Sequence, residues 1–211
     1  MVIFSHRGIG FGKENSLEAF TLAVKEGFSV EVDLRLKENN VVLTHNVLNR
    51  PGEPFEFSGL LKLIDSNPGA LFALHIKENS RLLFNKVIDS TRSLRNCLLF
   101  VTDFAQKQFI SNAVKKIGKE RLVLYVTTKT LPLDLIDNVE YLWLDETRKK
   151  IYRSLKNYAS FNKKLICCSP EIFIVDDIQN NLKRFKKIVY GNNLFGVCTD
   201  FVKGWVDGKT I

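Results

Sequence analysis

The chain has 211 residues, enough for one domain with a substantial hydrophobic core. Hydrophobic residues make up 45% and charged residues 26% of it, an ordinary balance for a globular protein, and no apolar run approaches the roughly 20 residues of a membrane-spanning helix. A predicted strand begins at Val2, so we expect no signal peptide. The formal net charge of +8 is compatible with an anionic partner such as nucleic acid, anionic lipid or a phosphorylated substrate.

Strand-like and helix-like segments alternate along the chain. The predicted strands are mostly short apolar runs, as expected for parallel strands buried on both faces, and lie at 2–5, 30–34, 41–44, 71–76, 97–102, 122–127, 141–144, 165–168 and 195–198. Helical patterns occupy residues 16–26, 60–66, 80–93, 105–117, 133–136, 148–161 and 178–190. Asn15 is expected to cap the first helix, with Glu18 at the capping-box position, and Gly27 to end it.

This alternation predicts an α/β fold, a (β/α)₈ TIM barrel that forms a single domain over residues 1–211. A doubly wound sheet would produce the same alternation. The barrel is favoured because polar residues fall at or just after the carboxyl ends of the strands, where barrel enzymes build their sites. These residues are His6, Asp33, Lys77, Asp103, Asp145, Glu171 and Asp200.

The three histidines of the chain all lie near the ends of predicted strands, and they are His6, His45 and His75. Side chains alternate between the two faces of a strand, so Glu31 and Asp33 share one face, and His75 shares a face with Lys77. A single histidine on a strand is more often a hydrogen-bonded core residue. The coincidence of all these positions instead indicates a polar pocket.

The cysteines and the basic residues bear on location and partners. Four cysteines in apolar strand-like runs predict buried thiols in a reducing, cytoplasmic compartment, and these are Cys97, Cys167, Cys168 and Cys198. Basic residues concentrate at 147–164 and 181–187, in helical patterns typical of a solvated basic face. No nucleic-acid motif accompanies them, so we expect at most weak attraction to an anionic membrane surface and no specific nucleic-acid partner. The oligomeric state stays open.

Ordered motifs over about the first 50 residues resemble the glycerophosphodiester phosphodiesterase family, a barrel of the phosphatidylinositol-phospholipase-C type. They are His6-Arg7-Gly8, Glu14-Asn15-Ser16-Leu17-Glu18-Ala19-Phe20, Gly27, Glu31-Val32-Asp33-Leu34 and Val42-Leu43-Thr44-His45. Further on, His75-Ile76-Lys77 fits a family site that usually reads E-x-K, and Thr199-Asp200 fits a closing G-x-x-T-D. From about residue 100 to 195 only the strand–helix rhythm is similar.

The resemblance implies metal-assisted hydrolysis of a small phosphodiester such as a glycerophosphodiester. It implies His6 and His45 as the acid/base pair, since imidazole titrates near neutrality, and Arg7 and Lys77 as phosphate ligands. It also implies that a divalent cation, Mg²⁺ or Ca²⁺, is held by three carboxylates, those of Glu14, Glu31 and Asp33. Glu14 has an alternative role at the helix start.

The chain also departs from the family pattern. His75 replaces a carboxylate, which makes Mn²⁺ or Zn²⁺ more plausible, or else His75 binds the phosphate beside Lys77. Asn46 replaces the aspartate that usually follows the second histidine, and Cys168-Ser169-Pro170-Glu171 stands where W-T-x-N is expected. Two alternatives therefore stay open: a sphingomyelinase-D-like phospholipid lyase, and a catalytically weakened relative that binds a phosphorylated ligand.

Overall fold

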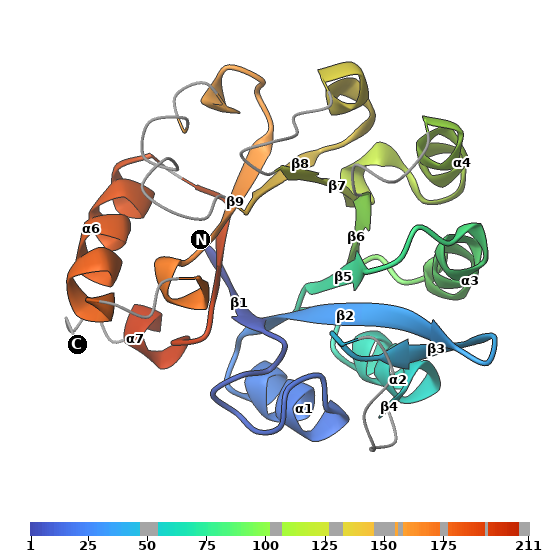
Figure 1. Ribbon diagram of the computed structural model, residues 1–211, viewed down its shortest axis with the longest axis horizontal. Coiled ribbons are helices and arrows are strands. Elements are labelled where there is room, and N and C mark those ends of the chain that lie inside the picture. The colour runs from blue at the N-terminus through green and yellow to red at the C-terminus, as the bar shows by residue number, and fades with distance from the viewer. Residues whose placement is uncertain are drawn as a thin grey trace.

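Eight parallel strands close into a barrel in the computed structural model, which describes residues 1–46, 55–101, 107–126, 133–145, 155, 158–173, 177–192 and 194–206. The first strand pairs with both the last and the second, so these eight strands form a closed ring (Figure 1). The barrel strands are β1 (Val2–His6), β2 (Ser29–Lys37), β5 (Phe72–Ile76), β6 (Cys97–Val101), β7 (Leu122–Val126), β8 (Tyr141–Leu144), β9 (Lys164–Cys168) and β10 (Gly196–Thr199). The predicted TIM barrel is therefore confirmed, and the doubly wound sheet is not formed.

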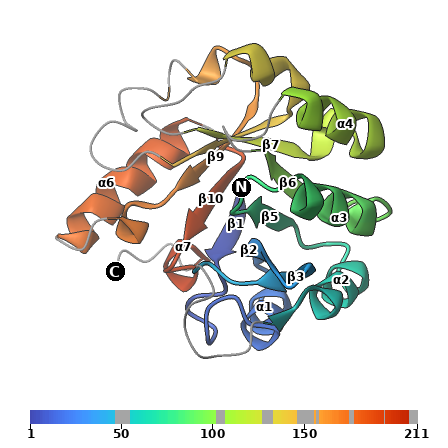
Figure 2. The ribbon, with the colours of Figure 1, turned by 45° about the vertical axis from the view of Figure 1, so that its right-hand side comes forward.

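Helices surround this ring of strands, with α1 to α4 along one side and α6 on another (Figures 1 and 2). They are α1 (Leu17–Lys25), α2 (Phe57–Ser66), α3 (Arg81–Thr91), α4 (Lys107–Ile117), α6 (Ile178–Gly191) and α7 (Lys203–Val206). The described residues also form the short 3₁₀ helices η1 (Lys119–Arg121), η2 (Leu133–Asn138) and η3 (Pro170–Ile172), so the helix predicted at 133–136 is a 3₁₀ helix. Most of the helix predicted at 148–161, and of the basic segment 147–164, lies outside the described residues.

Alternation along the strands separates two hydrophobic cores. Outward side chains such as Val32 and Leu74 pack with the helices, while inward ones such as Phe4, Phe100 and Trp143 fill the barrel. The Trp143 ring lies 4.6 Å from that of Phe100 and 5.5 Å from that of Phe4, measured between centroids. The barrel interior is therefore filled by a packed hydrophobic core that includes several aromatic rings.

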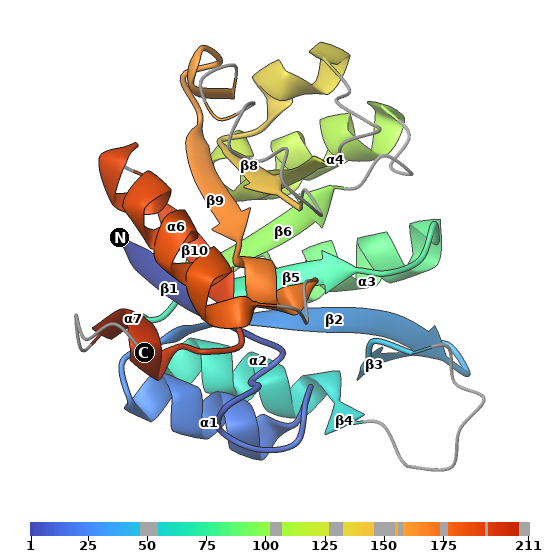
Figure 3. The same cartoon turned by 60° about the vertical axis from the view of Figure 1, so that its left-hand side comes forward.

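The hairpin of β2 and β3 (Asn40–Leu43) places His45 at the mouth of the barrel. Strand β2 extends past its neighbours and pairs with antiparallel β3, which pairs in turn with the short β4 (Phe55–Glu56), a strand that the sequence did not predict (Figure 3). Glu38 and Asn39 both have positive φ, as a tight two-residue hairpin turn requires. The amide of Thr44 then donates to the carbonyl of Asp33 at 3.0 Å, which places the next residue beside the end of β2.

The start of α1 differs from the prediction. Ser16, not Asn15, is the N-cap, because its side chain accepts a hydrogen bond from the amide of Ala19. Glu18 is then the second helical residue and does not occupy the capping-box position. Asn15 has a φ of 55° and its side chain turns to Asp33 instead. Gly27 ends the helix as expected, with a φ of 85°.

The described residues include a basic helix face and the four cysteines. Along α6 the apolar stripe is buried while Lys183, Arg184 and Lys187 are exposed, so the predicted basic face is present there. All four cysteines are buried free thiols. No helix within the described part of the chain is long and apolar enough to cross a membrane.

Candidate active site

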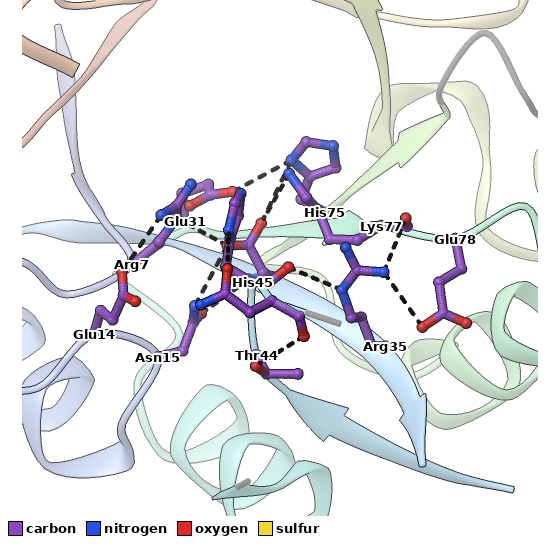
Figure 4. Close-up of polar contacts among 12 residues, drawn as sticks. Arg7, Glu14, Asn15, Glu31, Arg35, Thr44, His45, His75, Lys77 and Glu78 are labelled. Atoms are coloured by element: carbon purple, nitrogen blue, oxygen red, sulfur yellow. Dashed lines mark hydrogen bonds and ion pairs between the residues drawn. The ribbon is translucent and has the colours of Figure 1, made fainter. Parts of the chain in front are cut away.

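Charged side chains from three neighbouring strands meet at the carboxyl ends of β1, β2 and β5 (Figure 4). The strand register explains this convergence, since His6 lies opposite Glu31, and Asp33 lies opposite His75. Glu31 and Asp33 point into the barrel and are almost completely buried, with 3% and 0% of their surface exposed. Residues of the E-x-D and H-x-K motifs therefore form one polar cluster, and the pocket expected around them stays a prediction.

Asp33 is the centre of this cluster. Its Oδ2 lies 2.9 Å from Arg7 Nε, its Oδ1 lies 3.4 Å from Lys77 Nζ, and Asn15 exchanges two hydrogen bonds with its side chain and backbone. Burial by itself would raise the pKa of Asp33, but the charges of Lys77, His75 and Arg7 outweigh it and lower that pKa to about 2. Asp33 is therefore ionised at physiological pH and holds two cations at the mouth.

Glu31, Asp33 and His75 form a cluster that could hold a metal ion. One possible ligand atom from each lies within 4.8 Å of the others, and His75 Nδ1 is 3.5 Å from Glu31 Oε1 and 3.8 Å from Asp33 Oδ1. Among the described residues Glu31 Oε2 and Asp33 Oδ1 are buried and accept no hydrogen bond. Asp33 Oδ1 is ion-paired with Lys77, so Glu31 Oε2 is the oxygen with the greater remaining capacity to bind a cation. Two carboxylates and one imidazole suit a divalent transition ion as well as a hard cation.

Neighbouring aromatic rings fix the orientation of His75. Its ring stacks on Phe100, with centroids 4.5 Å apart and planes at 14°, and contacts Tyr125 at 5.1 Å. The aromatic core therefore supports the ring that the family pattern would replace by a carboxylate.

Glu14 is placed differently from the other two carboxylates predicted as metal ligands. It is 45% exposed, and its Oε2 lies 3.4 Å from the Arg7 guanidinium. Arg7 therefore bridges Glu14 and Asp33, and Glu14 stands outside the Glu31–Asp33–His75 cluster. Its role as a ligand stays a prediction.

His6 is held by a carboxylate from the far end of the chain. Its Nδ1 lies 2.8 Å from Asp200 Oδ1, at the end of β10. Burial alone would lower the pKa of His6, but the hydrogen bond to Asp200 and the charge of Glu31 together raise it above 6.5. His6 therefore favours the protonated state more than an ordinary histidine does.

The pKa of His45 is shifted in the opposite direction, below its usual value. Burial is the largest influence and lowers its pKa, and the nearby charges of Arg7 and Lys77 lower it further against the opposing effect of Asp33. Its Nδ1 lies 3.3 Å from Asn46 Oδ1, and its carbonyl accepts a hydrogen bond from Arg35 at 2.9 Å. The two histidines proposed as an acid/base pair therefore favour different protonation states.

Several residues of this mouth received no role from the sequence. Asp145 follows β8, and its buried Oδ1 has no hydrogen-bond partner among the residues that the structure describes. Burial raises the pKa of Asp145 to about 6 against the charges of Lys77 and His6. Asp200 and Glu171 support His6, and Arg35 holds the His45 backbone. Position at a strand end was the available signal for Asp145 and Glu171, and Asp200 also belonged to the closing Thr199-Asp200 motif. Asp103, singled out in the same way, lies outside the described residues.

Comparison with known proteins supports the fold. No family model and no curated protein sequence matches the chain. Among solved structures, a candidate glycerophosphodiester phosphodiesterase from Galdieria sulphuraria matches with a TM-score of 0.72 and 14% identity, covering 96% of this chain and 95% of that one. Two phosphodiesterases from Parabacteroides distasonis also match, a glycerophosphodiester phosphodiesterase and a glycerophosphoryl diester phosphodiesterase. The first matches with a TM-score of 0.71 and 12% identity, covering 96% of this chain and 93% of that one. The second matches with a TM-score of 0.64 and 17% identity, covering 94% of this chain and 82% of that one. The chain therefore has the barrel fold of solved glycerophosphodiester phosphodiesterases.

Proposed function

We propose that the protein is a phosphoric diester hydrolase acting on a small phosphodiester, with a glycerophosphodiester as the first candidate. One observation carries this proposal: two cationic side chains, an acidic cluster with an imidazole, and a carboxylate-held histidine all meet at one end of a barrel. The similar fold of the solved phosphodiesterases supports it.

Arg7 and Lys77 are the proposed phosphate ligands. They approach different oxygens of Asp33, at 2.9 and 3.4 Å, so both cations already lie at the mouth in fixed positions. The guanidinium offers a planar pair of donors to phosphate oxygens, and the ammonium offers a compact charge. Together they would neutralise a phosphodiester anion and orient it over the acidic cluster.

Glu31, Asp33 and His75 are the residues we propose to hold a divalent cation. The family resemblance implies Mg²⁺ or Ca²⁺, and the imidazole of His75 also suits Mn²⁺ or Zn²⁺. Such an ion, when bound, withdraws charge from the phosphoryl oxygens. Glu14 is paired with Arg7, so we propose that it becomes a metal ligand only when this ion pair breaks.

His6 and His45 are the proposed acid and base. With Nδ1 engaged by Asp200, His6 presents its other ring nitrogen as a donor, which would give its proton to the departing alcohol oxygen. His45 would accept the proton of the attacking water, so hydrolysis consumes one water and leaves a phosphomonoester and an alcohol. The directions of the two pKa shifts agree with these roles. That the two rings face each other across the mouth stays a prediction.

Two other functions use the same residues. A lyase would direct an internal hydroxyl of the substrate, in place of water, at phosphorus and release a cyclic phosphate. A non-catalytic relative would bind the phosphorylated ligand without turnover. The latter is favoured by one specific feature, the imidazole of His75 where the family has a carboxylate, because it removes a negative charge from the cluster.

The test measures hydrolysis of bis(4-nitrophenyl) phosphate and of glycerophosphoethanolamine, in chelator and in Mg²⁺, Ca²⁺, Mn²⁺ or Zn²⁺. Phosphorus NMR separates a monoester product from a cyclic one. Lys77→Ala should lose most of the activity, whereas the exposed Lys183→Ala, which removes the same charge from α6, should keep it. A cyclic product would establish the lyase. Ligand binding without turnover in every metal would overturn the hydrolase proposal.

A further inference from the structure

The carboxylate of Glu171 links the ends of two barrel strands. Glu171 lies in η3, directly after β9, and its Oε1 accepts a hydrogen bond from the amide of Asp200 at 3.3 Å. The same oxygen accepts from the Thr199 hydroxyl, and Oε2 accepts from the Ser169 hydroxyl. Thr199 and Ser169 are completely buried, so the three donors and their acceptor form a closed network behind the end of β10.

This network fixes the residue that holds His6. The Thr199 hydroxyl that donates to Glu171 also accepts from the amide of Phe201 at 3.0 Å, so both backbone amides flanking the Asp200 side chain are tied. Asp200 then places its Oδ1 2.8 Å from His6 Nδ1. Pairing of β1 with β10, with Ser5 opposite Thr199, fixes the backbone of His6 beside the end of β10. A small change in the turn after β10 would therefore move the Asp200 carboxylate away from the His6 ring.

We propose that Glu171 is a positioning residue of the proposed phosphodiesterase reaction, which holds Asp200 in place and thereby sets the orientation of the His6 ring. This inference rests on the proposed function for its kinetic consequence only. Within the described part of the chain the Glu171 carboxylate accepts hydrogen bonds from Ser169, Thr199 and Asp200, so Asp200 connects it to His6. The Glu171 carboxylate binds the amide of Asp200, and the Asp200 carboxylate binds the imidazole of His6.

The alternative is that Glu171 merely stabilises the barrel. The variants Glu171→Ala and Glu171→Gln separate the two. Alanine removes both acceptors, while glutamine keeps an acceptor oxygen for the amide of Asp200. Glu140→Gln is the matched control, since Glu140 pairs with Lys164 at the opposite, amino end of the barrel strands.

The first readout is the Nδ1–H proton of His6 in NMR spectra, which is visible as a slowly exchanging downfield signal while it is bonded to Asp200. Only three histidines need assignment. The signal should be present in the parent, lost in Glu171→Ala, restored in Glu171→Gln and unchanged in Glu140→Gln. Because this measurement needs no turnover, it tests the network even if the proposed hydrolysis fails.

The second readout is the division between kcat and KM. Glu171→Ala should lower kcat by about 10- to 100-fold, the usual cost of removing a group that orients an imidazole, with KM changed by less than about twofold. Glu171→Gln should recover most of kcat. A folded Glu171→Ala that keeps both the His6 signal and kcat would overturn the inference.

A third variant decides the matter if Glu171→Ala does not fold. Glu171→Asp keeps the charge but shortens the side chain by one methylene, so it cannot span the distance to Asp200 in the same geometry. Loss of the His6 signal in this folded variant supports the positioning role, and a signal like that of the parent refutes it. Absence of the signal in the parent would also refute it, because the Asp200–His6 bond would then not hold the ring.

Discussion

Replacing Asp145 with asparagine is expected to stabilise the folded protein at neutral and alkaline pH. Burial raises the pKa of Asp145 from 3.8 to about 6, although the charges of Lys77 and His6 oppose the shift. The Asp145 carboxyl group therefore binds its proton more tightly in the folded state than in the unfolded chain. The free energy of unfolding consequently falls as the pH rises through this range, from about 4 to about 6, and stays low above it.

The size of the effect follows from the shift. A difference of 6 − 3.8, about 2.2 units, at about 1.36 kcal/mol per unit, corresponds to a cost of up to about 3 kcal/mol for the ionised carboxylate at pH 8. Screening at this partly exposed position reduces it to about 1–3 kcal/mol. At pH 5 the folded side chain is still mostly protonated, and the cost is roughly half as large. Asparagine is neutral at every pH, so its stabilising effect should follow the same curve.

The assay is urea unfolding of the parent and Asp145→Asn at pH 5, 6, 7 and 8. Chelator is present throughout, because a bound cation would change the titration of the mouth. Asp137→Asn, at an exposed carboxylate in η2, is the control and should show no such pH dependence. A gain that is equal at pH 5 and pH 8, or no gain at all, would refute the assignment of a buried, destabilising charge to Asp145.

Three further predictions concern the mouth of the barrel. His6→Ala and His45→Ala should each lower kcat/KM by about 10²- to 10⁴-fold, the usual contribution of a positioned acid or base, while circular dichroism shows an intact fold. Removing divalent ions should abolish activity, and calorimetric titration should detect one site that Glu31→Gln or Asp33→Asn weakens; full activity in chelator with no binding at millimolar ion would exclude the metal site. His75→Glu should raise the affinity for Mg²⁺ or Ca²⁺, since it returns a hard oxygen and a negative charge to the cluster. Identical metal profiles for that variant and the parent would show that His75 is neither a ligand nor a phosphate contact.

The sequence by itself determined the barrel and most residues of its mouth. Short apolar runs separated by helical patterns predicted the eight barrel strands, because strands buried on both faces need apolar residues at nearly every position. The two-residue period of a strand also placed Glu31 and Asp33 on one face, and the structure brings them together with His75. These features are local, so short stretches of sequence are enough to reveal them.

Only the tertiary structure decided which distant partners meet. His6 and Asp200 are 194 residues apart, and they touch because β1 closes the barrel against β10. Pairing of β9 with β10 places Glu171 on the amide of Asp200. Pairing of β1 with β2 brings the loop after β1, with Asn15, to Asp33, although the local pattern had made Asn15 a helix cap. A residue's own neighbourhood in sequence reports which face it occupies. Its hydrogen bonds, its charge state and its metal-binding capacity depend on the groups that the closed sheet packs against it.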